Sequence, residues 1–297
     1  MNRLHAGVLL VLSLCAVPVG LSAQTPVHYG RSLDRTADVR VMTLNGTVQV
    51  EGWDRDSVDV TGTVAKGVTP YVGGSRSGFK VATYDGVTTT DTRADLVVRV
   101  PRHASVWVKT TLASVAVSGL GSTVDVYTMG GSILVRGSPD ALVAESMRGL
   151  ITVEGTPGWV RLKNGSGVVR LTDLRARDVS VSTVSGSITG TLGAQRVRLE
   201  TMSGAITTTH VFVPESTTDI DTHDGSVTVR SGSGVGGVRP PAGLSVRIYS
   251  QRGSVRNEWT ADRTAGATGT GTELIFGTGA ARLMIRTFSG AVHLVPR

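Results

Sequence analysis

Apolar residues recur at every second position in short runs along this chain, and each run is interrupted by the same short phrase. Residues 179–190 read VSVSTVSGSITG, and residues 197–208 read VRLETMSGAITT. An apolar residue at every second position is typical of a strand with one buried face. Each copy of the phrase therefore predicts two short strands joined by a bend at Ser-Gly.

The phrase returns at a nearly constant distance, and its Gly can be taken as the anchor of each unit. Six anchors fall at Ala113, Gly131, Gly149, Gly167, Gly186 and Gly204, with successive gaps of 18, 18, 18, 19 and 18 residues. Looser copies anchored at Gly46, Gly86, Gly225, Gly253 and Gly290 bring the total to eleven units. A fixed short period is the signature of a repeat architecture, in which each unit buries its apolar face against the next.

A second constant feature lies three residues before each anchor. Every unit has Thr, Ser or Asn there, at Thr43, Thr83, Thr110, Thr128, Ser146, Asn164, Thr183, Thr201, Thr222, Ser250 and Thr287. A short hydroxyl or amide side chain at this place can hydrogen-bond the local backbone and hold the bend. The residue that follows, apolar in units such as those of Met147 and Met202, is expected to point inward.

These patterns predict an all-β fold, a β-solenoid of about eleven two-strand units with a period near 18. A β-sandwich or meander, in which the same strands would form hairpins, is the alternative. The constant period and the repeated Thr, Ser or Asn favour the solenoid, because stacking places like residues above like. We expect a single repeat domain over residues 38–297, most regular at 106–208.

The N-terminal segment carries a different pattern. Residues 1–23 combine the basic Arg3, an apolar stretch and a small residue before Gln24, which is typical of a secretory signal peptide. Residues 24–37 are then expected to be a loose leader. The only cysteine, Cys15, lies in the signal segment, so the mature chain is expected to have no disulfide and no cysteine-based metal site. The protein is therefore predicted to be exported, to the periplasm or outside the cell, without a transmembrane anchor.

The composition agrees with a strand-rich fold and limits the classes of partner that are expected. The chain of 297 residues has 38 Gly and only 4% aromatic residues, which fits pleated strands and tight turns. The formal net charge is +7, but the basic residues are dispersed among acids. Without a basic cluster or stacking aromatics, nucleic acid is not expected as a partner.

The first group of candidate catalytic residues lies in the sequence DIDTHDG, residues 219–225. Asp219 and Asp221 are expected to point outward on one strand, and His223 occupies an inward slot. Glycoside hydrolysis would need two carboxyl groups at a defined separation across one bond. We interpret the cluster as a solvated strand face instead, because no partner that would orient a base is evident. No catalytic residue, metal or cofactor is expected.

A second candidate surface is a stripe of outward residues, each three positions after an anchor. It comprises Thr152, Arg170, Thr189, Thr207, Thr228 and Arg256. Such a stripe can bind an extended polymer, and it also matches an ordinary solvated sheet. The candidate binding residues are therefore Arg170, Thr189, Thr207, Asp219, Asp221 and His223.

The repeated T-x-S-G-x-I/V, at 183–188, 201–206 and 287–292, resembles the bacterial putative-adhesin family, a family of β-strand-repeat proteins of unknown function. The resemblance covers about residues 38–297 and implies a right-handed β-helix-like fold in the envelope or outside the cell. It carries no catalytic residues. The expected function is an exported, non-catalytic interaction or structural module of the cell envelope, with a cell-surface glycan or an envelope protein as partner. The alternative is a β-helix carbohydrate-active enzyme, a polysaccharide lyase or hydrolase.

Overall fold

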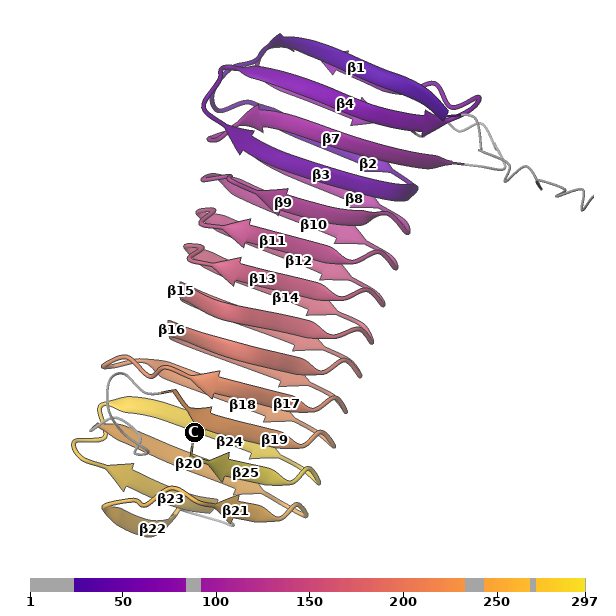
Figure 1. Cartoon of the computed structure of the whole chain (residues 1–297). Helices are drawn as coiled ribbons and strands as arrows, with labels where there is room; N and C mark the ends of the chain where they lie inside the picture. Colours follow the sequence, from indigo (N-terminus) through magenta and orange to yellow (C-terminus); the bar gives the residue numbers. More distant parts are fainter. Residues whose placement is uncertain (1–23, 84–91, 233–242, 268–270, 297) are drawn as a thin grey trace, which may run out of the picture.

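The computed structural model describes residues 24–83, 92–232, 243–267 and 271–296, and shows strands but no helix in these ranges. The predicted signal peptide at residues 1–23 and the anchor Gly86 lie outside them. The strands stack into one long body in which each coil contributes one strand to each of two rows (Figure 1). The prediction of an all-β, solenoid-like repeat is therefore confirmed.

The first row holds the strands that lead into the bend at the constant Thr, Ser or Asn, with further strands added at both ends of the stack. From one end of the stack to the other it consists of β5 (Tyr71–Gly74), β6 (Gly78–Ala82), β2 (Asp38–Thr43), β8 (Ser105–Thr110), β10 (Thr123–Thr128), β12 (Ala141–Ser146), β14 (Trp159–Asn164), the second parts of β15 (Val169–Thr183) and β16 (Ile188–Thr201), then β18 (Thr217–Thr222), β24 (Ala281–Thr287), β20 (Leu244–Ser250), β23 (Gly271–Phe276) and β22 (Arg263–Ala267).

The second row holds the strands that follow the bend, with further strands added at the N-terminal end of the stack. In the same direction it consists of β1 (Gln24–Ser32), β4 (Ser57–Ala65), β7 (Arg93–Pro101), β3 (Asn45–Trp53), β9 (Ser114–Ser118), β11 (Ile133–Gly137), β13 (Ile151–Gly155), the first parts of β15 and β16, then β17 (Ile206–His210), β19 (Val227–Ser231), β25 (Val292–Val295) and β21 (Val255–Asn257).

Equivalent strands of successive units pair in parallel, one period apart. Thr110 of β8 pairs with Thr128 of β10, which in turn pairs with Ser146 of β12. Hairpins would instead pair the two strands of one unit antiparallel. The sandwich or meander alternative is therefore wrong for the repeats.

The core lies between the two rows and is built from alternate residues. Val124, Val126, Ile133 and Ile151 are at most 1% exposed. Met147, which was expected to point inward, is instead 53% exposed. The bend turns two residues outward, and the next inward position is the anchor itself, which is buried in this unit at Gly149.

The constant polar residue holds the bend, as predicted, by a hydrogen bond to the anchor. The Thr128 hydroxyl accepts from the Gly131 amide at 3.0 Å, and the Ser146 hydroxyl accepts from the Gly149 amide at 2.8 Å. Asn164 does more, because its amide group also donates to the Gly149 carbonyl of the neighbouring coil at 2.8 Å. The buried backbone donors of the bend are thereby satisfied without water.

The coils do not follow sequence order at the two ends of the stack. β2 lies between β6 and β8, and β24 lies between β18 and β20, as the yellow strand among orange ones shows (Figure 1). The chain's last strand, β25, lies between β19 and β21. This last described strand is therefore inside the stack and not at its edge.

Antiparallel strands cover both ends of the stack. β4 pairs with β7 at one end, and β23 pairs with β20 at the other. β1 pairs with β4 along its whole length, so the expectation of a loose leader over residues 24–37 is wrong. The alternation of this strand explains the error, since Val27 and Tyr29 are partly buried against the core. Covering strands of this kind limit the exposure of unpaired backbone.

Candidate functional site

The six candidate residues lie on two separate surfaces. Arg170, Thr189 and Thr207 belong to the second row, whereas Asp219 and Asp221 of β18 belong to the first row and His223 to the bend that follows. The structure therefore divides the candidates between a stripe and a cluster.

The predicted side-by-side placement of the stripe residues is confirmed, with one addition. Strand pairing places Thr152, Arg170, Thr189, Thr207, Thr228, His293 and Arg256 side by side in that order. His293 is the added residue of the stripe, because β25 lies between β19 and β21. Neighbouring strands are about 4.8 Å apart. The stripe therefore offers hydroxyl and guanidinium groups at regular steps to an extended ligand.

In the cluster, Asp221 is held by a residue far away in sequence. Arg286 of β24 donates from Nε to Oδ1 at 2.6 Å and from Nη2 to Oδ2 at 3.2 Å. The Asp221 carboxylate raises the pKa of the Arg286 guanidinium above its usual value. Both oxygens of this carboxylate are engaged by one guanidinium, so neither oxygen is free to contact a reacting group.

The bend beside this ion pair carries an aromatic stack. The His223 and Phe288 rings are stacked with centroids 4.8 Å apart, and the Arg252 guanidinium lies 5.0 Å from the Phe288 centroid. His223 was expected to point inward, but its side chain is 53% exposed, because the bend turns this position outward. Hydrogen bonds from Ser289 and then from His223 lower the pKa of Asp224.

An open depression of about 600 Å³ joins these groups. Its lining includes Asp221, His223, Tyr249, Arg286 and Phe288. Asp219 lies outside it, in a second depression of about 520 Å³ with Trp159 and Arg198. Asp219, Asp221 and His223 therefore do not line one common depression.

Sequence reasoning missed Arg286, Phe288 and Arg252. Arg286 is 65 residues from Asp221, and Phe288 is 65 residues from His223. Arg252 is 29 residues from His223. These residues become neighbours only because β24 is inserted between β18 and β20. The period of 18 gave no signal for that insertion.

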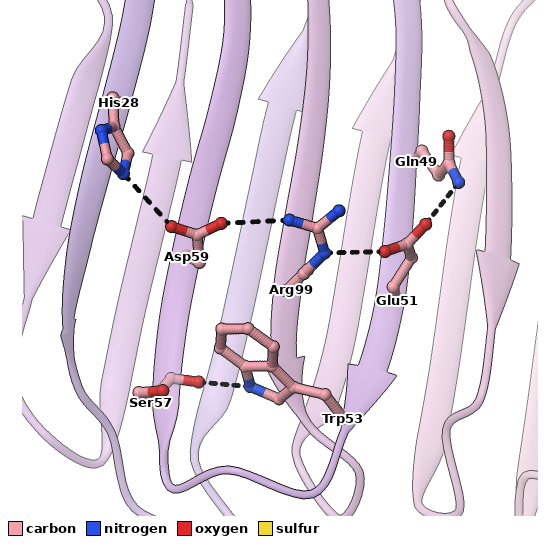
Figure 2. A network of polar contacts seen from close by, with 7 residues as sticks. All are labelled: His28, Gln49, Glu51, Trp53, Ser57, Asp59 and Arg99. Atoms are coloured by element: carbon pink, nitrogen blue, oxygen red, sulfur yellow. Dashed lines mark hydrogen bonds and ion pairs between the residues drawn. The ribbon is translucent and has the colours of Figure 1, made fainter.

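A chain of polar contacts crosses four strands at the N-terminal end (Figure 2). The Arg99 guanidinium binds Glu51 at 2.9 Å and Asp59 at 3.3 Å, and His28 lies 3.5 Å from Asp59. Gln49 donates to the other oxygen of Glu51. These contacts join the covering strands β1 and β4 to β7 and β3, and we interpret them as structural.

Two further observations bear on the class of site. Within the described ranges, no group of three or more His, Cys, Asp or Glu side chains is arranged to hold a metal ion. No helix in the same ranges has the length and apolarity to cross a membrane.

One titratable side chain lies in the core. His210 is 2% exposed, its Nε2 is 2.9 Å from the Thr208 hydroxyl, and its ring stacks on Phe212 at 5.5 Å. Burial lowers the pKa of His210 from 6.5 to about 4. The imidazole is therefore neutral in the folded protein at neutral pH.

We expect His210 to make the free energy of unfolding depend on pH. Between pH 6.5 and about 4 the unfolded chain binds a proton at this residue and the folded chain does not, so stability is lost as pH falls through this window. The loss reaches about 3 kcal/mol and stops below the folded pKa. Urea unfolding at pH 7 and pH 4 measures it, with His210→Asn as the control. An unchanged difference between the two pH values in His210→Asn would contradict the assignment.

Comparison with known proteins gives a family and a set of solved structures. A family model described as Toastrack DUF4097 matches residues 36–294. A putative adhesin from Bacteroides fragilis is similar with a TM-score of 0.47 and 11% identity, over 92% of this chain and 99% of that one. Putative adhesins from Parabacteroides merdae (TM-score 0.41, 12% identity, 70% and 96% covered) and Parabacteroides distasonis (0.36, 12%, 93% and 98%) are also similar. No curated protein matches the chain.

Proposed function

The chain belongs to the Toastrack DUF4097 family, and from that premise we propose that it is an exported, non-catalytic module of the cell envelope that binds an extended cell-surface glycan. A right-handed winding of about eleven units is part of this proposal. Export is supported by the signal-like sequence at residues 1–23.

The proposal that the module is non-catalytic is supported by the ion pairs that its acidic side chains form. Asp221 is bound at both oxygens by Arg286, and Glu200 is bound by Arg198 at 2.6 Å. A retaining or inverting glycosidase needs one carboxyl group that holds a proton and a second that attacks or activates water. Asp221 has both oxygens engaged by one guanidinium, so this pair does not present the two free carboxyl groups that such an enzyme uses.

Glycan binding is supported by the regular outward surfaces. The stripe repeats hydroxyl and guanidinium donors along the stack, and on a separate surface the depression beside Asp221 adds the exposed His223. Hydroxyl-rich polymers are bound by such hydrogen-bond donors. The flat, repeated geometry fits a long ligand better than a small one.

The test measures binding and turnover on the same polysaccharides. We expect retardation of the chain in gels containing alginate, hyaluronate, xylan or amylose, with no release of reducing ends. Arg170→Ala and His223→Ala should weaken retardation on at least one polymer, while Thr61→Ala, on the covering strand β4, should not. Release of reducing ends that is lost in Asp221→Ala would establish the enzyme alternative. Absence of retardation on every polymer would refute glycan binding.

A further inference from the structure

The bends of six successive coils carry an exposed apolar ridge. We call Leu112, Met129, Met147, Val184 and Met202 the bend ridge; their exposed fractions are 57%, 44%, 53%, 62% and 57%. Only two other large hydrophobic side chains are exposed in the described residues, Tyr71 and Val255. Exposed apolar side chains that gather in one contiguous line, and are not scattered singly, mark a contact surface.

The ridge has one gap. The bend of the coil between Met147 and Val184 carries Gly165 at the corresponding position. A Cβ added to Gly165 would lie 2.4 Å from the Met147 carbonyl oxygen, so this step of the stack cannot hold a side chain. The ridge therefore consists of three side chains, a notch and two more side chains.

Polar residues follow the ridge at one side, on the last outward position of each first-row strand. In coil order they are Lys109, Tyr127, Glu145, Lys163, Ser182 and Glu200, and they lie side by side by strand pairing. The signs of the charges along this line are plus, zero, minus, plus, zero, minus. When a second copy of this line runs in the opposite direction, each positive position lies opposite a negative one. Two antiparallel copies of the line are therefore complementary in charge.

We propose that the bend ridge is the contact between two copies of this chain, packed antiparallel about a two-fold axis between the coils of Ser146 and Asn164. Met147 of each copy then enters the Gly165 notch of the other. Met129 faces Val184 of the second copy, and Leu112 faces its Met202. The axis is perpendicular to the strand rows, so the first-row faces of both copies lie on the same side, as a self-complementary interface requires.

The charges select this register over its neighbours. At the proposed register Lys109 faces Glu200 of the second copy, and Glu145 faces Lys163. A shift by one coil in one direction places Glu145 against Glu145, and a shift in the other direction places Lys163 against Lys163. Like charges in direct contact suppress an interface, so the proposed register is favoured over both one-coil shifts.

The contact is small. Five half-exposed side chains per copy correspond to an interface near the lower limit of about 1,200 Å² that specific complexes bury. The dimer is therefore expected to dissociate on dilution and to be favoured where the protein is concentrated.

Cysteine cross-linking tests the register directly. The chain beginning at Gln24 contains every described strand and lacks Cys15, the only cysteine. Met129 and Val184 are three coils apart in one copy, about 14 Å, which is beyond the Cα separation of about 7 Å that a disulfide spans. An equal mixture of a Met129→Cys chain and a Val184→Cys chain should form a disulfide-linked heterodimer under mild oxidation. Each variant alone should cross-link no faster than the off-ridge control Val255→Cys.

Charge reversal gives an independent readout by analytical ultracentrifugation. We expect Lys163→Glu to raise the dimer dissociation constant at least about tenfold, because it places a negative charge against Glu145 of the second copy. The double variant E145K/K163E restores complementarity and should dimerise like the unmodified chain. Thermal unfolding of each variant checks that the monomer is intact. A chain that stays monomeric at millimolar concentration, a dimer insensitive to Lys163→Glu, or cross-linking of single variants that equals the mixture would each overturn the proposal.

Discussion

The substitution Ile151→Asp is expected to abolish cooperative folding. Ile151 is fully buried in β13, where it pairs with Ile133 on one side and Val169 on the other. An unpaired carboxylate at this place loses its hydration and gains no cation, which costs at least about 5 kcal/mol. Natural domains have a total stability of only about 5–15 kcal/mol. Far-UV circular dichroism during urea unfolding is the measurement.

Thr189→Asp is the matched control for this change. Thr189 lies on the outward face of β16 and is only partly buried, so the new carboxylate stays hydrated. The expected loss is below about 1 kcal/mol. Equal unfolding midpoints for Ile151→Asp and Thr189→Asp would contradict the inward and outward assignment of the whole array.

Gly149→Ala is expected to cost the second largest amount of stability, at least about 3 kcal/mol. A Cβ at this anchor would lie 1.8 Å from the Gly131 carbonyl oxygen of the preceding coil. The neighbour is backbone, and its own bend is fixed by the hydrogen bond between the Gly131 amide and Thr128, so it cannot turn aside as a side chain would. The urea midpoint of Gly149→Ala should therefore fall well below that of the unmodified chain.

Gly121 provides the comparison, because it lies in a turn on the other side of the coil. A Cβ there would meet nothing closer than the His103 ring at 3.7 Å, an ordinary contact. Gly121→Ala is expected to change stability by less than about 1 kcal/mol. If the two alanine variants unfold together, close stacking of the anchors is not what excludes a side chain at Gly149.

Much of the architecture could be predicted from the sequence because stacking requires similar residues at equivalent positions of successive coils. The constant residue at Thr128, Ser146 and Asn164 was visible as a pattern, and it makes the predicted bond to the anchor. The outward stripe around Thr189 also followed from the period. In both cases the structural neighbour is one period away in sequence, so counting residues is sufficient to find it.

The errors arose where neighbours are not one period apart, or where backbone geometry overrides alternation. Met147 was placed inward because it is apolar and the next inward position was taken to be one residue after Ser146, whereas the bend turns two residues out. The stack of His223 on Phe288 was missed because the coil of Phe288 is inserted out of order. The strand at residues 24–32 was missed because its partner, β4, is antiparallel and outside the repeat.

The inserted coil also constrains the order of assembly during synthesis. The strands of the middle coils leave the ribosome in the order in which they stack, so each has a finished neighbour to pair with as it appears. β20 and β21 emerge before β24 and β25, which separate them from β18 and β19. Until residues 281–295 have been made, the β18–β19 coil lacks its final neighbour. The β18–β19 coil and the β20–β21 coil therefore reach their final pairing only after residues 281–295 have been made, however early the first coils are complete.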